Sequence, residues 1–150
     1  MNCKVVGTDI SPIQPSYVPL NCKFELHDAE EEWSFRDNTF DLIHLSRMLG
    51  CIHDWTKLYK EAYRCLKPGG WIEHTDLSIR LTADDSSLPP DSPYRIWEQF
   101  FVDAGIKTGK EFNIVDNNQQ ETWLKEAGFP VESIQVVCAG RVRVEWASEG

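Results

Sequence analysis

A strand, a helix and a second strand follow one another between residues 40 and 76, and this succession constrains the fold most. The strand candidate Phe40–Ser46 has enough apolar residues that we expect both of its faces to be buried. Asp54 then supplies a helix N-cap, and apolar residues recur at helical spacing until Lys-Pro-Gly-Gly at 67–70 stops the helix. Residues 71–76 resume as a strand. Such a unit has parallel strands joined by a right-handed crossover, so the sequence predicts an α/β fold.

Further elements flank this unit. Ser92 and Pro93 stand in the order typical of a helix start, with the helix ending near Gly105, and a second helix is predicted at 118–127. The remaining strand candidates are residues 3–8, 22–27, 131–139 and 141–146. We therefore predict a single, partial domain over residues 1–150: a mostly parallel sheet with helices on both faces and room for an antiparallel last strand.

Composition excludes several classes of function. The chain has 150 residues, 41% of them hydrophobic, which suits one sizeable core. Its net charge of −9 disfavours direct binding to nucleic acid. The five cysteines are scattered and mostly lie in apolar runs, which predicts buried thiols in a reducing compartment. With no signal peptide or long apolar span in view, we expect a cytoplasmic or nuclear protein that does not bind membranes.

Two acidic residues follow predicted strands. Asp9 closes the first strand, before Ile10-Ser11-Pro12, and Asp28 follows the second. A carboxylate fixed at a strand end can accept hydrogen bonds from both hydroxyls of a ribose, and series of such ends are typical of nucleotide sites. Each residue also has an ordinary explanation, because Asp9 suits a turn with Ser11 and Asp28 suits a helix N-cap.

Other polar residues allow weaker hypotheses. His44 or His74, near Glu73 and Asp76, is a candidate general base, although a structural histidine is the commoner case. Cysteine and histidine at 51 and 53 have no second cluster to match them, so we predict no metal site. A Tyr-x-x-x-Lys pattern at 63–67 would suit a nicotinamide enzyme, but its lysine lies where it complements a helix dipole.

The predicted helix after Ser92 carries an aromatic face. It follows a loop of about a dozen residues after a strand, a place where lids over active sites occur, so a contribution to a substrate pocket competes with a role in the core. The residues of this face are Tyr94, Trp97, Phe100, Phe101 and Ala104.

Four stretches of the sequence together resemble the fungal LaeA-like methyltransferases, S-adenosylmethionine-dependent enzymes of the Rossmann type (class I). The likeness runs over about residues 5–129, and the first two stretches are its most distinctive part. They read VGTDISPIQP at 6–15, HDAEEEW at 27–33, FDLIH at 40–44 and LKPGGWIE at 66–73.

The resemblance implies a cofactor, S-adenosylmethionine, and residues that would hold it. Asp9 would bind the ribose and Ile10 would pack on the adenine, while Asp28 with Ala29 would meet the adenine edge. Ser46 would approach the methionine part. The resemblance implies methyl transfer to an acceptor that it does not identify, names no catalytic residue, and links the family to fungal secondary metabolism.

One part of the family's pattern is missing. In the family, a strand with a glycine-rich loop precedes the position of Val5, where this chain has only Met-Asn-Cys-Lys. We therefore expect an N-terminally truncated fold, without the first strand and the glycine-rich loop, whose neighbouring sheet edges are unpaired. Two hypotheses follow: a methyltransferase, or a catalytically inactive methyltransferase-like domain that acts as a regulatory protein-interaction module.

Overall fold

The computed structural model describes residues 3–83, 85, 87–138 and 141–145, with side chains left out of account at 136–138 and 141–142. The chain divides into two compact units, Met1–Ser34 and Phe35–Gly150, which are described one at a time. That both units belong to one domain stays a prediction.

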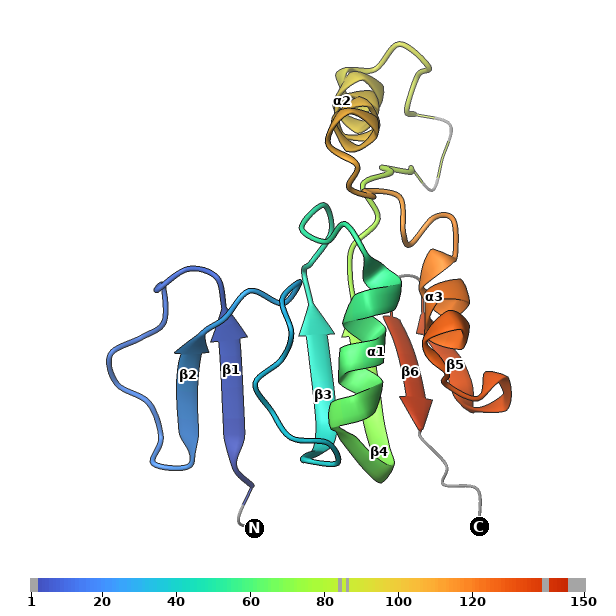
Figure 1. Cartoon of the computed structure of the whole chain (residues 1–150). Coiled ribbons are helices and arrows are strands. Elements are labelled where there is room, and N and C mark those ends of the chain that lie inside the picture. Colours follow the sequence, from blue (N-terminus) through green and yellow to red (C-terminus); the bar gives the residue numbers. More distant parts are fainter. Residues whose placement is uncertain (1–2, 84, 86, 139–140, 146–150) are drawn as a thin grey trace. The chain divides into compact units, whose positions relative to one another are not determined.

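The first unit contains two parallel strands, β1 (Val5–Asp9) and β2 (Cys22–Leu26). Val5 lies opposite Cys22 and Asp9 lies opposite Leu26, so the carboxyl ends of both strands are at the same edge (Figure 1). The connection between them contains no helix, because prolines at 12, 15 and 19 cannot donate the backbone hydrogen bonds that a helix needs. The two strands predicted here are confirmed, with β1 reaching one residue further to include Asp9 itself.

The second unit contains a four-stranded sheet in the order β3-β4-β6-β5. β3 (Phe40–Ser46) runs parallel to β4 (Leu66–Thr75), whereas β6 (Arg141–Glu145) is antiparallel to both β4 and β5 (Ile134–Cys138). The predicted parallel pair and the antiparallel last strand are therefore confirmed. The end residues of the last two predicted strands, Ala139 and Trp146, lie outside the described residues.

Helix α1 (Trp55–Cys65) connects the parallel strands β3 and β4. Its N-cap is Asp54, whose side chain accepts a hydrogen bond from the Lys57 amide at 2.8 Å. The chain passes from the helix directly into β4, and the Lys-Pro-Gly-Gly segment forms a register shift at the start of that strand, with Gly69 at a φ of 76°. The predicted strand-helix-strand unit is confirmed.

Two further helices follow β4. In α2 (Pro93–Thr108) the Ser92 side chain accepts a hydrogen bond from the Tyr94 amide, and the helix ends at a left-handed Gly109, one turn later than we predicted. α3 (Gln119–Ala127) ends at Gly128, which also has left-handed backbone, as predicted. Within this unit, α2 lies beyond the carboxyl ends of β3 and β4 (Figure 1).

Helices α1 and α3 pack against each other on the same face of the sheet, although we expected helices on both faces (Figure 1). The alternation along β3 agrees with coverage of one face, because Ile43 and Leu45 are buried while Leu42 is 59% exposed. Our prediction that both faces of β3 are buried was wrong. The central side chains of this core are Leu58, Tyr59, Ala62, Ile72, Leu124 and Val144.

The aromatic face of α2 is largely exposed rather than part of the core. Tyr94, Trp97 and Phe100 have exposed fractions of 58%, 46% and 67%. Phe101 is half-buried and connects this face to the loop after the helix, because its ring lies 5.4 Å from that of Phe112. Among the described residues, no helix is long and apolar enough to cross a membrane.

The prediction of buried thiols was wrong for two cysteines. Cys3 and Cys51 are exposed, Cys22 is half-buried, and only Cys65 among the four whose side chains are described is buried. Apolar neighbours in sequence failed as a guide because Cys3 precedes the first strand and Cys51 lies in the loop after β3, where the backbone runs along the surface.

These exposures predict different thiol reactivities. Burial raises the pKa of the Cys65 thiol, which lowers its thiolate fraction, and the fold also blocks access to it. We expect iodoacetamide to alkylate Cys3 and Cys51 in the native protein, and Cys65 about tenfold or more slowly. Mass spectrometry of peptides from timed reactions measures each site. If the three thiols are alkylated at equal rates in denaturant but at unequal rates in buffer, the fold is the cause of the difference.

Candidate functional site

Asp9 ends β1 with its carboxylate turned toward the following loop. Oδ1 accepts a hydrogen bond from the Ser11 amide at 2.8 Å, which is the turn that competed with a binding role in the sequence. The structure records no partner for Oδ2 among the residues it describes. A turn and a ligand contact are therefore compatible, since one oxygen serves the turn and the other remains able to accept a hydroxyl hydrogen bond.

Asp28 lies two residues beyond β2 and uses its carboxylate in a similar way. Its Oδ1 accepts a hydrogen bond from the Glu30 amide at 2.9 Å, and its backbone carbonyl accepts one from the Glu31 amide. The chain makes a turn here rather than the helix for which Asp28 would have been the N-cap. The indole of Trp33 donates a hydrogen bond to the Ala29 carbonyl at 3.2 Å, which connects the residues after this turn back to its start.

The structure brings these two acidic residues to one edge of the first unit. The His27 amide donates to the Asp9 carbonyl at 3.0 Å, so the segment that leads to Asp28 is joined to the end of β1. Parallel neighbours lie about 4.8 Å apart, which places both carboxylates at adjoining strand ends. Ile10, next to Asp9, is 71% exposed and offers an apolar surface beside them. Two acceptors next to an apolar side chain suit a nucleoside, whose ribose and base need both.

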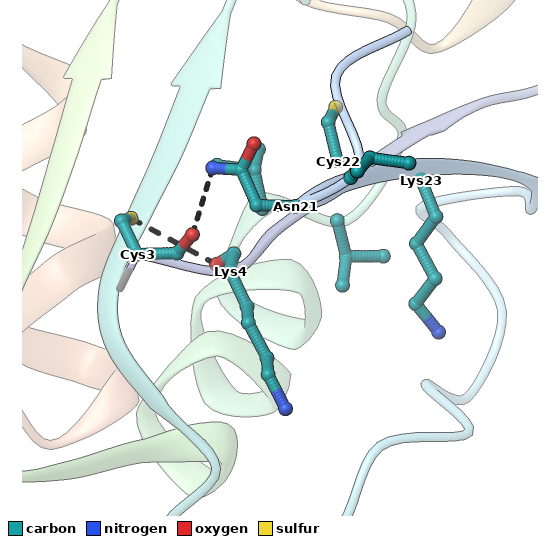
Figure 2. A pocket seen from close by; sticks show the side chains of 8 residues that line it. Cys3, Lys4, Asn21, Cys22 and Lys23 are labelled. Atoms are coloured by element: carbon teal, nitrogen blue, oxygen red, sulfur yellow. Dashed lines mark hydrogen bonds between the residues drawn. The ribbon is translucent and has the colours of Figure 1, made fainter. Parts of the chain in front are cut away.

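The first unit also has a depression of about 660 Å³, but it lies at the other end of the strands. Figure 2 shows the side chains around it, including Cys3, Lys4, Asn21 and Lys23, with the Asn21 amide donating to the Cys3 carbonyl at 2.8 Å. These residues precede or begin β1 and β2, whereas Asp9 and Asp28 follow their ends. The depression is therefore not part of the acidic edge.

Ser46, the remaining predicted site residue, belongs to the second unit. It ends β3 opposite Thr75 and is exposed. Directly after it, Arg47 has a φ of 58°, and its amide donates to the Thr75 carbonyl at 3.2 Å. The chain thus turns sharply off the sheet at Ser46, as it does at Asp9 in the other unit.

The two candidate bases have different surroundings. His44 is exposed on β3, with its Nδ1 3.0 Å from a carboxylate oxygen of Glu73. Arg143 donates to the other oxygen of Glu73 at 2.8 Å, so Glu73 contacts both His44 and Arg143 at the surface of the sheet. His74 is 1% exposed and lies inside the second unit. A buried imidazole of this kind has no access to a substrate, which favours the structural role for His74.

A buried polar cluster around His74 joins α1, β4 and α3, and sequence analysis did not find it. His74 Nδ1 lies 2.5 Å from the Tyr59 hydroxyl and 3.1 Å from the side-chain nitrogen of Gln120, and its Nε2 lies 3.1 Å from Asp76 Oδ2. Burial, with a smaller effect of the Asp76 carboxylate, raises the pKa of Tyr59 well above its usual range. Tyr59 therefore keeps its proton and acts as a donor. The spacing of His74, near the end of β4, and Asp76, directly after it, was the available signal, but their partners are distant in sequence.

Other sequence patterns do not form sites. The Lys67 ammonium binds the Asp41 carboxylate at 2.8 Å, while the ring of Tyr63 packs edge-on against Phe129. Among the described residues, no three histidine, cysteine or acidic side chains lie close enough to hold a metal ion.

Known proteins resemble this chain in sequence and in fold. The profile described as "Methyltransferase domain" matches residues 1–134. The chain belongs to this methyltransferase family. The methyltransferase pytC of Aspergillus terreus is 38% identical over 125 residues, which are 83% of this chain and 38% of the relative. The secondary metabolism regulator LAE1 of Cochliobolus heterostrophus is 37% identical over 131 residues, 86% of this chain and 42% of the relative.

The resemblance to LaeA-like methyltransferases is thereby confirmed, and S-adenosylmethionine is the cofactor of this class of enzyme. The chain spans about two-fifths of the length of these relatives. The fold agrees as well. An S-adenosylmethionine-dependent methyltransferase from Methanosarcina mazei superimposes with a TM-score of 0.62 at 15% identity, covering 97% of this chain and 83% of that one. The Rossmann-like methyltransferase fold predicted from the sequence is therefore confirmed.

Proposed function

We propose that this methyltransferase-family chain binds the adenosyl part of S-adenosylmethionine at the edge formed by Asp9, Ile10, Asp28 and Ala29. The observation that carries the proposal is that the carboxyl ends of β1 and β2 lie side by side. Their parallel register and the hydrogen bond from the His27 amide to the Asp9 carbonyl bring Asp9 and the segment leading to Asp28 together. In this assignment Asp9 accepts hydrogen bonds from the ribose hydroxyls through Oδ2. Ile10 packs on the adenine ring, and the segment at 28–29 contacts its edge.

The reaction we propose is methyl transfer to an acceptor of unknown identity, in the setting of fungal secondary metabolism. When bound, S-adenosylmethionine supplies an electrophilic methyl group, which passes to an oxygen, nitrogen or carbon nucleophile as the carbon–sulfur bond breaks and its electron pair stays on sulfur. The chain's own task is to hold the reactants in line and to exclude water, for which a strong base is not required. Ser46, at the turn after β3, is the residue we assign to the methionine part.

A titration of the protein with S-adenosylmethionine and S-adenosylhomocysteine tests this assignment. We expect saturable binding that Asp9→Ala weakens about tenfold or more, or ~1.4 kcal/mol, because hydrogen bonds to a charged acceptor are lost. Asp9→Asn is the sharper variant, since its side-chain oxygen can keep the turn with Ser11 while the charge is removed. Isothermal calorimetry measures both affinities.

The matched control is Asp41→Ala, which removes an exposed carboxylate near the start of β3, at the end of the strand away from Ser46. It should leave the affinity unchanged. Binding that is equally strong in the wild-type chain and in both Asp9 variants would contradict the proposed site, and the absence of any binding by the wild-type chain would contradict the proposed function.

A second candidate, a catalytically inactive interaction module, has one structural observation in its favour. Among the described strands, β1 pairs only with β2 and β3 pairs only with β4, so each presents an edge with backbone groups able to pair with a further strand. An added strand is a common way to recognise an extended peptide. Saturable cofactor binding that depends on Asp9 distinguishes the enzyme from this alternative.

A further inference from the structure

Asp76 is a buried carboxylate that joins two loops at the carboxyl end of the second unit's sheet. It directly follows β4 and is 4% exposed. Its Oδ2 accepts a hydrogen bond from the Met48 amide at 3.1 Å, across 28 residues of sequence, and its Oδ1 accepts one from the Leu77 amide at 3.2 Å. One side chain therefore holds the loop after β3 and the loop after β4.

The donors around Asp76 fix the direction of the hydrogen bonds behind it. Backbone amides can only donate, so the Asp76 carboxylate is an acceptor and His74 Nε2, 3.1 Å away, is its third donor. With the Nε2 hydrogen directed at Asp76, Nδ1 is the acceptor in this tautomer, and its single lone pair accepts from the Tyr59 hydroxyl at 2.5 Å. The Gln120 side-chain nitrogen lies 3.1 Å from the same atom. Tyr59 therefore donates to His74, and His74 donates to Asp76. The Met48 amide also donates to Asp76, from the loop after β3.

Packing holds the imidazole in this orientation. The ring of Trp55 is stacked on that of His74 with centroids 5.0 Å apart, and the ring of Trp123 stacks on Trp55 at 5.6 Å. Tyr59 is fully buried and Gln120 is 3% exposed, so the hydrogen bonds to His74 are shielded from water. The carboxylate of Asp76 is consequently held in one place by groups from α1, α3 and β4.

Besides Asp76, backbone hydrogen bonds attach the loop after Ser46 to the second unit, including one from the Gly50 amide to the Glu111 carbonyl at 3.2 Å. Arg47 and Gly50 both have left-handed backbone, with φ of 58° and 68°, so the segment between them is a sharp turn. The Arg47 amide bonds to the Thr75 carbonyl, the Met48 amide bonds to Asp76, and the Cys51 amide bonds back to the Met48 carbonyl. Met48 is thus the residue of this turn whose amide bonds to a buried side chain.

We propose that Asp76, oriented by His74 and Tyr59, is a positioning residue that fixes residues 47–50 and thereby the place of Ser46. This inference rests on the proposed function in one respect, the assignment of Ser46 to the methionine part of the cofactor. Asp76 does not touch the cofactor in this scheme. It holds the turn that directly follows Ser46, so the loss of Asp76 should loosen this turn before it destabilises the whole unit.

Amide hydrogen exchange measured by NMR on the full chain tests the positioning directly. In Asp76→Asn the side chain keeps its shape but has one acceptor oxygen and one NH₂ group, so it cannot accept from Met48, His74 and Leu77 together. We expect the Met48 amide to exchange about tenfold or more faster, with unchanged exchange at the Leu58 amide in α1. Asp116→Asn, a carboxylate that binds the Ser78 hydroxyl at 2.8 Å, is the matched control and should change neither rate.

The affinity for S-adenosylhomocysteine, measured on the same variants, tests the link to the site. We expect a loss of about fivefold or more for Asp76→Asn and none for Asp116→Asn. If Asp76→Asn does not fold, Tyr59→Phe removes a single hydroxyl from the buried cluster and should give the same pattern with smaller changes.

Three results would overturn the inference. These are unchanged exchange at Met48, equal acceleration at Met48 and Leu58, which would make Asp76 a general stabiliser, and faster exchange at Met48 without loss of affinity. A wild-type chain that binds no cofactor would contradict the proposed function instead, and exchange at Met48 would then still decide whether Asp76 fixes the loop.

Discussion

Replacing Trp55 with alanine is expected to lower the free energy of unfolding by about 3–5 kcal/mol, the range for removing a large aromatic side chain from a core. Trp55 is 2% exposed and begins α1. Its ring lies between those of Trp123 and His74, so its removal leaves a cavity between α1 and α3 and also frees the imidazole that orients Asp76. Urea unfolding followed by far-ultraviolet circular dichroism measures the change.

The chain provides a matched control for this variant. Trp97→Ala removes the same side chain from α2, where it is 46% exposed, and should cost at most about 1 kcal/mol. A similar loss for both variants would contradict the view that the core of the second unit lies between α1, α3 and the sheet. Dichroism is the appropriate signal, because tryptophan fluorescence would change with the mutation itself.

Replacing Gly50 with alanine is expected to destabilise the protein by about 2–4 kcal/mol, the sum of backbone strain and steric overlap. Gly50 has a φ of 68°, and a Cβ there would lie 2.1 Å from carbon atoms of the Phe112 ring. Either the ring moves, which disturbs its contact with Phe101, or the turn after Ser46 opens. Urea unfolding gives the size of the effect, and exchange at Met48 shows which of the two occurs.

A second glycine separates strain from overlap. Gly109 also has left-handed backbone, with a φ of 72°, but nothing lies within 4 Å of a Cβ built there. Gly109→Ala should therefore cost only about 1 kcal/mol, from the backbone alone. If both variants cost the same, the contact between Gly50 and Phe112 would not be a determinant of the loop's structure.

Local signals explain why much of the second unit could be predicted. The Asp54 and Ser92 caps, the proline at 93 and the glycine at 128 each fix a helix end through chemistry that acts within one turn. The parallel pairing of β3 and β4 followed from the single helix between them. By contrast, whether a strand has one covered face or two depends on which helices pack on the sheet, and the alternation in β3 was too weak to show it.

The candidate site also has residues that the sequence could identify and residues that it could not. Asp9 and Asp28 could be singled out because a strand end is a local feature, and parallel pairing then brings neighbouring ends together. Their role as cofactor ligands stays a prediction. The cluster around His74 could not be found, because Tyr59, Gln120 and Met48 come from three separate elements and no spacing in the sequence relates them to Asp76. Cys51 was misjudged for a related reason: its neighbours in sequence are apolar, but the loop that carries it is at the surface.

The uncovered aromatic side chains of α2 have a practical consequence for work with this protein. Environment-sensitive dyes such as anilinonaphthalene sulfonate fluoresce when they adsorb to apolar surface, and Tyr94, Trp97 and Phe100 offer such surface in the folded state. A thermal scan read with such a dye would begin from a high baseline, and a bright signal at room temperature would not indicate a molten or damaged preparation.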